Sequence, residues 1–164
     1  MAGELLHSWT VDQAVSPATG GARIEVRNEH RVAYFSDHTP QSLNFAGVLS
    51  RVYAGGGLTV NIVWTSRTAV IGDVVWDVAV ESFTPDADDL DVDTFAAANT
   101  VTDTIGSAAG EPMVAACTFT DGADMDSLAA GEYFRLSVTR DTEDEADTLV
   151  GDAQIIAVEV IQTA

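Results

Sequence analysis

The sequence contains no lysine and only one cysteine, and both scarcities narrow its possible functions. All seven basic residues are arginine and stand against 26 acidic residues, so this chain of 164 residues has a formal net charge of −19. Nucleic-acid binding depends on basic side chains that neutralise phosphates, so we expect no nucleic-acid partner. Attachment to an anionic membrane is disfavoured for the same reason. With Cys117 alone, no intramolecular disulfide can form.

Long apolar runs are also missing. A membrane-spanning helix needs about 20 consecutive apolar residues, and no segment approaches that length, so we expect no membrane insertion. The first residues, MAGELLHSWTVDQ, lack a basic segment followed by a long apolar core. They therefore do not resemble a secretory signal, and we expect synthesis in the cytoplasm.

The large negative charge has a physical cost, because like charges repel one another and destabilise the compact state. Concentrated salt relieves this cost, since the Debye length falls to about 3 Å at 1 M. An acidic, lysine-free surface is therefore suited to brine, and we interpret the chain as halophilic. The melting temperature should rise as NaCl is raised to molar concentrations; a melting temperature insensitive to salt would contradict this interpretation.

Apolar and polar residues alternate with a period of two along most of the chain, which is typical of strands with one buried face. The alternation predicts inward-facing residues in four long strands: Leu58, Val60, Ile62 and Trp64; Val74, Trp76, Val78 and Val80; Phe134, Leu136 and Val138; Ile156, Val158 and Val160. Five shorter strands are predicted at Ala22–Val26, Val32–Phe35, Asn44–Leu49, Thr100–Thr104 and Val114–Thr120. We therefore predict an all-β fold, a single antiparallel β-sandwich of the jelly-roll type with about eight or nine strands.

Helical patterns are scarce. Asp91–Asn99 predicts one or two turns with Asp91 or Asp93 as the N-cap, and Asp124–Glu132 predicts one turn that ends at Gly131. We assign residues 22–164 to the jelly-roll domain. Residues 1–21 form either an arm that orders against a neighbour or an edge strand of the chain's own sheet, and the pattern does not decide between the two.

The segment TPDADDLDVDTF, Thr84–Phe95, carries five aspartates and no basic residue. As a calcium loop it fails twice, because the sixth position counted from Asp86 is not glycine and the twelfth is not acidic. Asp88, Asp89 and Asp91 remain candidate ligands for a divalent cation, since carboxylates are the oxygen donors that such ions prefer. The competing interpretation is a solvated acidic loop, and apart from this candidate cation we expect no cofactor.

Catalytic motifs are absent from the sequence. Cys117 lies in a strand pattern, where a free cysteine behaves as a small hydrophobic residue. The three histidines show neither HxH nor HExxH spacing, and no serine stands in a GxSxG elbow. Paired carboxylates of a glycosidase are not specified by a sequence with acids everywhere. We therefore expect a protein that is not an enzyme.

An ordered series of segments carries a resemblance to a known class of proteins. The series reads RNEHRVAYFSDHTPQSLNFAGVLSRVYAGGGLTVNIVW (Arg27–Trp64), GDVVWDVAVESF (Gly72–Phe83), DTFAAANT (Asp93–Thr100), FTDGADMDSLAAGEYFRLSVTRD (Phe119–Asp141) and GDAQIIAVEV (Gly151–Val160). It resembles small single-domain virion structural proteins of tailed viruses, here in an acidic version like that expected of a haloarchaeal virus. The resemblance covers residues 22–163 and contains no catalytic residues.

This resemblance implies a jelly roll displayed on a virus particle as a head decoration or cement protein, a turret or a fibre base. Its partners would be copies of itself, most often in a homotrimer, together with the major capsid protein or other virion proteins. Its location would be the virion surface. The alternative is a glycan- or receptor-binding jelly-roll module on a turret, fibre or tail.

Two segments are candidates for contact with neighbouring subunits. Leu5, Leu6 and Trp9 are too apolar to suit a free tail, and they either meet a neighbour or join their own sheet. The second segment is the loop Tyr53–Gly57, in which Tyr53, Gly55 and Gly56 are the candidate contacts. Trp64 and Trp76 are expected in the core, because both fall on inward faces.

Overall fold

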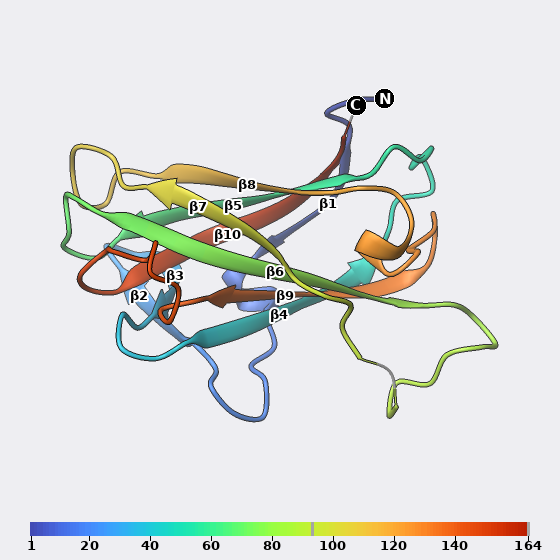
Figure 1. Cartoon of the computed structure of the whole chain (residues 1–164), viewed down its shortest axis with the longest axis horizontal. Helices are drawn as coiled ribbons and strands as arrows, with labels where there is room; N and C mark the ends of the chain where they lie inside the picture. The colour runs from blue at the N-terminus through green and yellow to red at the C-terminus, as the bar shows by residue number, and fades with distance from the viewer. Residues whose placement is uncertain (93, 164) are drawn as a thin grey trace.

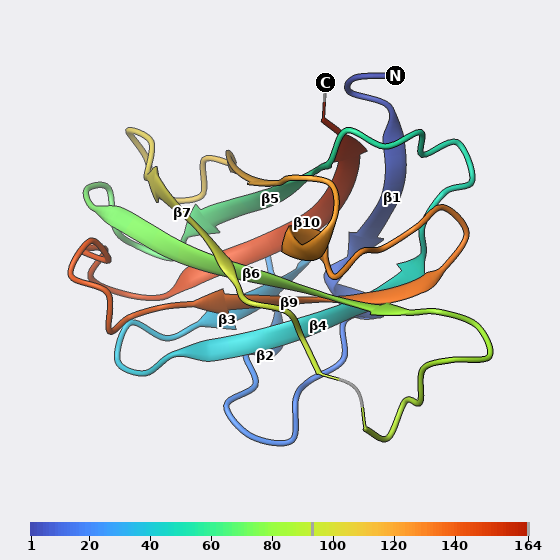
Figure 2. The same ribbon diagram turned by 45° about the vertical axis from the view of Figure 1, so that its right-hand side comes forward.

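The computed structural model describes residues 1–92 and 94–163 as two antiparallel sheets packed face to face (Figures 1 and 2). The larger sheet has the order β2-β3-β10-β5-β8, with β1 also paired to β10, and the smaller sheet has the order β4-β9-β6-β7. The strands are β1 (Leu5–Thr10), β2 (Arg23–Arg27), β3 (His30–Phe35), β4 (Gln41–Val48), β5 (Leu58–Ser66), β6 (Asp73–Phe83), β7 (Asn99–Thr104), β8 (Met113–Phe119), β9 (Tyr133–Arg140) and β10 (Ala153–Gln162). The predicted all-β, jelly-roll sandwich is confirmed, and each of the nine predicted strands is present.

Alternation places the core residues as predicted in three of the four long strands. Trp64 and Trp76 are fully buried and meet edge to face, with their ring centroids 6.2 Å apart. This arrangement is favoured by the quadrupoles of aromatic rings. The two indoles therefore join the two sheets at the centre of the sandwich.

The fourth strand, β10, departs from the prediction. A β-bulge interrupts its pairing with β5 between Ile155 and Ala157, and the bulge reverses the alternation on one side. As a result Ile155 is buried in place of Ile156, whereas Val158 and Val160 face inward as expected. The prediction for Ile156 was wrong because a single extra residue shifts the inward set by one position.

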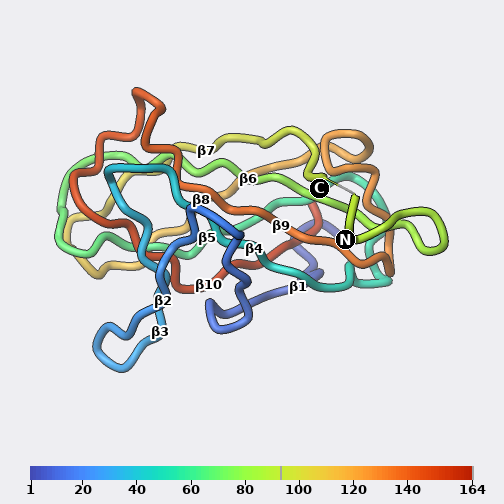
Figure 3. The backbone as a smooth tube through the Cα atoms, turned by 90° about the horizontal axis from the view of Figure 1, so that it is seen from below, coloured from blue at the N-terminus to red at the C-terminus, as the bar shows by residue number. Residues whose placement is uncertain are grey.

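The bulge also marks a change of partner along one edge of β10. Ala153–Ile155 pair with β3, and residues 157–161 pair with β1. β3 therefore leaves the sheet where β1 joins it, and the hairpin formed by β2 and β3 is free to project from the body of the sandwich (Figure 3). This departure creates the space described below as the hairpin pocket.

The helical predictions were partly wrong. The described residues of Asp91–Asn99 form turns and extended chain rather than a helix; Asp93 lies outside the described residues. Near the second predicted turn, a short 3₁₀ helix, η2, covers Ala123–Met125 and ends at Asp126, which has a left-handed backbone, rather than at Gly131. A second 3₁₀ helix, η1 (Val11–Gln13), was not predicted. In the described part of the chain, no helix is long and apolar enough to cross a membrane.

Candidate functional site

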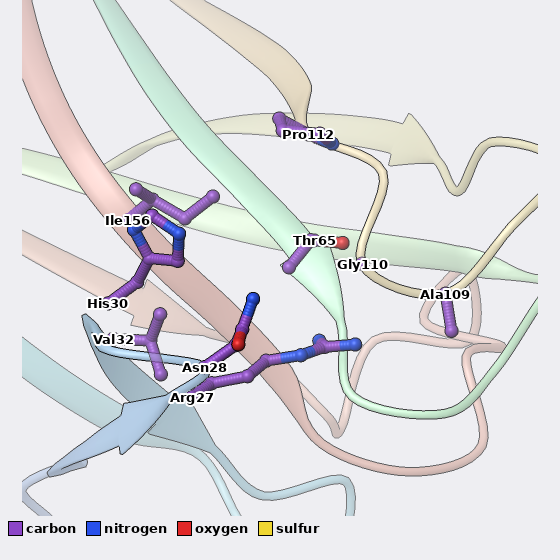
Figure 4. A pocket seen from close by; sticks show the side chains of 9 residues that line it. All are labelled: Arg27, Asn28, His30, Val32, Thr65, Ala109, Gly110, Pro112 and Ile156. Carbon is purple, nitrogen blue, oxygen red and sulfur yellow. The ribbon is translucent and has the colours of Figure 1, made fainter.

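A pocket of about 540 Å³ opens on the outer face of the larger sheet, between the β2–β3 hairpin and the loop that leads into β8 (Figure 4). We call it the hairpin pocket. Its lining residues are Arg27, Asn28, His30, Val32, Thr65, Ala109, Gly110, Pro112 and Ile156. Its volume lies in the usual range for small-molecule sites, about 300–1,000 Å³.

The hairpin that forms one wall is closed by a two-residue turn. Arg27 pairs with His30, and the residues between them, Asn28 and Glu29, have φ values of 45° and 68°. Positive φ at both central positions is the feature of a type I′ turn, whose twist matches that of the flanking strands. Asn tolerates this backbone well, but Glu29 occupies a position that favours glycine.

Replacing Glu29 with glycine should therefore stabilise the protein by about 1 kcal/mol, because the left-handed backbone no longer carries a side-chain penalty. Chemical denaturation measures the change. Glu29→Ala is the matched control, since it removes the same charge but keeps the β-carbon. If Glu29→Ala stabilised the fold as much as Glu29→Gly, charge rather than backbone conformation would be the cause.

Arg27 crosses from the hairpin to the sheet and is held there by one nitrogen. Its Nη1 donates to the carbonyl oxygen of Ser66 at 2.8 Å and to Oε1 of Gln154 at 2.6 Å. Figure 4 shows the side chain extended across the pocket toward Gly110. A β-carbon at Gly110 would lie 2.8 Å from Nη2 of Arg27, and Gly110 has a φ of +88°, so glycine is required both for the backbone and for the guanidinium.

Beneath the pocket lie polar groups that lack partners. Thr65 lines the pocket, and Gln154 is its cross-strand neighbour in the outer layer of the sheet; both are buried. Oγ1 of Thr65 and Nε2 of Gln154 form no hydrogen bond with any described residue. Buried polar groups are nearly always paired, so two unpaired atoms beneath one pocket are unusual.

Two aliphatic side chains, Val32 and Ile156, and two with rings, His30 and Pro112, also line the pocket. Val32 is almost fully buried, and Ile156, displaced outward by the bulge in β10, is half-buried beside it. His30 and Pro112 are exposed, and Figure 4 shows the His30 ring next to Ile156. The pocket thus combines an aliphatic patch with a cluster of hydrogen-bonding groups, as small-molecule sites do.

The outer face of the smaller sheet is covered at both ends by the chain itself. At one end, Val75 is bonded to the acidic loop between β9 and β10. Its amide donates to Asp147, and its carbonyl oxygen accepts the amide of Asp141. At the other end, Arg135 pairs with the fully buried Glu81 at 2.7 Å and lies over the ring of Phe95. The hairpin pocket lies on the opposite face, that of the larger sheet.

The structure places the apolar N-terminal residues in their own sheet. β1 pairs along β10, and the side chains of Leu6 and Trp9 are buried in the core, whereas Leu5 is exposed. The indole of Trp9 donates to the carbonyl oxygen of Ala46 at 2.8 Å, which ties β1 to the opposite sheet. This corrects the assignment of Leu6 and Trp9 as interface residues, because an edge strand with one buried face uses them internally. Leu5 alone remains available for contact.

The loop at Tyr53–Gly57 is also largely internal. The hydroxyl of Tyr53 donates to Asp121 at 2.7 Å and accepts the amide of Gly57 at 3.1 Å, and the ring is buried. Burial, together with the hydrogen bond to Asp121, raises the pKa of Tyr53 to about 12. Tyr53 therefore stabilises the loop from within, which corrects its assignment as an interface residue. Gly56 is exposed, and Gly55 is partly exposed.

The acidic stretch does not assemble a cation site. Oδ2 of Asp88 accepts the amide of Thr84 at 2.7 Å, and Oδ1 of Asp89 accepts the amide of Asp91 at 2.9 Å. Such bonds are typical of aspartates that stabilise turns. Across residues 1–92 and 94–163, no group of three or more His, Cys, Asp or Glu side chains is arranged to hold a metal ion. The candidates Asp88, Asp89 and Asp91 are therefore not brought together as ligands.

Cys117 behaves as its strand pattern predicts. It faces the core of the sandwich and is buried. Burial, with a smaller contribution from the carboxylates of Asp77 and Asp124, raises the pKa of the thiol to about 12. Because the thiolate is the nucleophilic form, Cys117 is unreactive in the folded chain near neutral pH.

Sequence reasoning missed two residues that line the pocket, Arg27 and Thr65, and Gln154, which holds Arg27. Arg27 lies just outside the predicted strand Ala22–Val26, and its bond to Gln154 joins residues 127 positions apart. The turn residues Asn28 and Glu29 were a usable indication of a hairpin, but no pattern shows that its arginine bends back over the sheet.

Comparison with known proteins finds similarity in structure alone. No protein-family model and no curated protein matches the sequence. With a TM-score of 0.51 and 11% identity, 98% of this chain matches 28% of a Clostridium thermocellum endo-1,4-beta-D-xylanase 10B structure, which contains CBM22-1 and GH10 modules complexed with xylohexaose. The CBM22-2 xylan-binding domain of Paenibacillus barcinonensis Xyn10C matches 96% of this chain over 99% of its own length, with a TM-score of 0.50 and 10% identity.

A third similar structure is the Agl-KA catalytic domain, of which this chain covers 28%, with a TM-score of 0.50 and 14% identity. The fold of this chain is thus the β-sandwich found in carbohydrate-binding modules. At such low identities the similarity establishes the fold, and function has to be argued from the site.

Proposed function

We propose that the protein is a non-catalytic module that binds a glycan in the hairpin pocket. The observation that carries the proposal is Arg27, which lines the pocket and is held by Ser66 and Gln154. Its Nε and Nη2 have no acceptor among the described residues. Sugar hydroxyl groups accept hydrogen bonds, so a bound sugar would pair with these donors, and a hydrogen bond to a charged group contributes about 1.5–3 kcal/mol.

The fold supports the same proposal. Two of the structures described above, the xylanase 10B with its CBM22-1 and GH10 modules and the CBM22-2 xylan-binding domain, are similar to this sandwich. Their sequences are too distant for their ligand to be carried over to this chain. What they support is the class of ligand, and the pocket of this chain supplies the place.

The mode of binding would depend on hydrogen bonds rather than on stacking against tryptophan. An exposed Trp or Tyr could stack on a sugar ring, yet Trp9, Trp64 and Trp76 are all buried. Tyr133, on the smaller sheet, is the most exposed of the three tyrosines, with 37% of its surface accessible. In the hairpin pocket, Ile156 and Val32 would instead meet the apolar face of a sugar ring.

Calorimetric titration with a panel of neutral and acidic oligosaccharides tests the proposal. Arg27→Ala should weaken binding of the bound oligosaccharide about tenfold or more, because a charge-assisted hydrogen bond contributes about 1.5–3 kcal/mol. Arg23→Ala is the matched control, since Arg23 lies on the same strand, is exposed and pairs with Glu25. Absence of binding across the panel, or equal effects of the two substitutions, would contradict the proposal.

A second candidate function is a structural role in a virus particle through self-association, and an exposed apolar patch favours it. Val70, Ile71 and Val150 are 56%, 82% and 80% exposed and line one shallow hollow with Thr148. Exposed apolar clusters on an otherwise charged surface mark protein contacts. A second copy of this chain is the occupant we propose, in a homotrimer mounted on a capsid shell.

Light scattering after size-exclusion chromatography tests this candidate at molar NaCl. The wild-type chain should have the mass of a trimer, and Ile71→Asp should have the mass of a monomer. Leu90→Asp is the control, because Leu90 is also an exposed apolar residue but lies in the separate acidic segment Thr84–Phe95. A wild-type monomer at all concentrations would exclude self-association through this patch.

A further inference from the structure

The hairpin pocket has a charge opposite to that of the rest of the molecule. The formal net charge of the chain is −19, yet the lining residues include the cation Arg27 and the titratable ring of His30 and not one carboxylate. With 26 acidic residues against seven basic ones, a recess that is lined by an arginine and free of acids is a local exception. The chemistry of the pocket therefore favours a ligand that carries negative charge.

Arg27 also presents the geometry that a carboxylate requires. Both hydrogens of Nη1 are used, one by Ser66 and one by Gln154. Nε and Nη2, whose N–H bonds point to the same side of the guanidinium plane, have no acceptor among the described residues. Two parallel N–H donors on one planar edge match the two oxygens of a carboxylate.

The surroundings of Arg27 hold this edge in place. Ser66 and Gln154 accept the hydrogen bonds of Nη1, so they act as positioning residues for the free Nε–Nη2 edge. The absence of a side chain at Gly110 leaves the space beside Nη2 open, since a β-carbon there would lie only 2.8 Å from that nitrogen. A donor pair that is already oriented binds with a smaller loss of conformational entropy.

We propose that the hairpin pocket selects a sugar that carries a carboxylate, that is, a uronic acid, and that the Nε–Nη2 edge of Arg27 binds the carboxylate in a bidentate manner. This inference rests on the proposed glycan-binding function and adds the class of sugar. The sugar ring lies toward Thr65, which lines the pocket. Ile156 contacts the apolar face of the ring.

A single negative charge fits the pocket better than a sulfate ester cluster or a phosphate. One free guanidinium edge compensates one charge, and the field of the chain's 26 acidic residues repels each further charge on the ligand. That repulsion is long-range and is suppressed at about 1 M salt, where the Debye length is about 3 Å, whereas the direct contact is shorter than this length. Titrations are therefore carried out at molar NaCl.

The experiment compares D-galacturonate with D-galactose, two sugars that differ in the oxidation of one carbon. The full chain labelled with nitrogen-15 is titrated with each, and the signal of the Arg27 Nε–H group reports the contact. We expect galacturonate to bind about tenfold more tightly than galactose and to shift this signal. Arg27→Lys, which keeps the charge but loses the planar edge, should abolish the preference, as should Gly110→Ala, while Arg23→Lys should retain it.

Each other outcome overturns a defined part of the inference. Equal binding of galactose and galacturonate would leave the glycan-binding function intact and exclude selection of a carboxylate. Acetate or inorganic sulfate binding as tightly as galacturonate would show a simple anion site and exclude the sugar. No binding of either sugar would overturn the inference, and absence of binding across the oligosaccharide panel would overturn the proposed function as well. The wild-type preference decides the matter even if a variant fails to fold.

Discussion

Replacing Arg140 with methionine should lower the free energy of unfolding by about 3–5 kcal/mol, the usual cost of leaving one partner of a buried ion pair unpaired. Arg140 is fully buried at the end of β9, and its Nε and Nη2 bind both carboxylate oxygens of Asp147, at 3.0 and 2.7 Å. Asp147 itself is only 3% exposed. Methionine fills much of the same volume, so the loss should report the missing charge rather than a cavity.

The same guanidinium also satisfies three backbone carbonyl groups. Nη1 donates to Gly151 at 2.8 Å and to Phe35 at 3.3 Å, and Nη2 donates to Leu149 at 2.7 Å. Arg140 therefore holds the acidic loop between β9 and β10 against the end of the sandwich. Without it, the loop should become susceptible to proteolysis.

Urea denaturation of two further variants controls this prediction. Arg67→Ala removes an exposed pair with Asp152 and should cost less than about 1 kcal/mol. The double variant Arg140→Met, Asp147→Asn should be less destabilised than Arg140→Met alone, because it leaves no unpaired buried charge. A cost for Arg140→Met no larger than that for Arg67→Ala would show that the buried pair does not stabilise the fold.

Replacing Trp64 with alanine should also lower the free energy of unfolding by about 3–5 kcal/mol, since it opens a cavity at the centre of the sandwich. Trp64 is fully buried, and its indole Nε1 donates to Asp103 at 2.7 Å. The bond reaches from β5 in one sheet to β7 in the other. Trp64 thus contributes both packing and a bond to a carboxylate.

The comparison of Trp64→Phe with Trp76→Phe separates these two contributions. Trp76 is equally buried, but its Nε1 has no partner among the described residues. The loss of ring volume is the same in both variants, so Trp64→Phe should cost about 1–3 kcal/mol more than Trp76→Phe, which removes an unsatisfied donor. Equal costs, measured by chemical denaturation, would show that the bond to Asp103 is not stabilising.

The sequence predicts the strands of this protein well because alternation is a local property. Val60 and Leu136 are recognisable as core residues from their neighbours alone. The β-bulge at Ile155 cannot be recognised in this way, because it depends on where β3 leaves β10 and β1 joins it. Likewise, the acidic stretch before β7 has the residues of a helix start, yet turns stabilised by Asp88 and Asp89 replace the helix.

The candidate site was less predictable than the fold, because its residues are distant in sequence. Thr65 and Gln154 become neighbours only when β5 and β10 pair. Thr65 lines the pocket and Gln154 holds Arg27 in place, and neither role is visible in the local sequence pattern. By contrast, the sequence left open whether Leu6 and Trp9 meet a neighbour or join their own sheet, because an apolar edge strand and an apolar docking segment have the same pattern; the structure buries both in the chain's own core.

The burial of all three tryptophans has a practical consequence for spectroscopy. Trp9, Trp64 and Trp76 are all within the core, and not one of them lines the hairpin pocket. Their emission should therefore be blue-shifted in the native chain and should move to the red on denaturation. A sugar in the pocket should leave the spectrum unchanged, so a screen by intrinsic fluorescence would record unfolding and overlook the ligand.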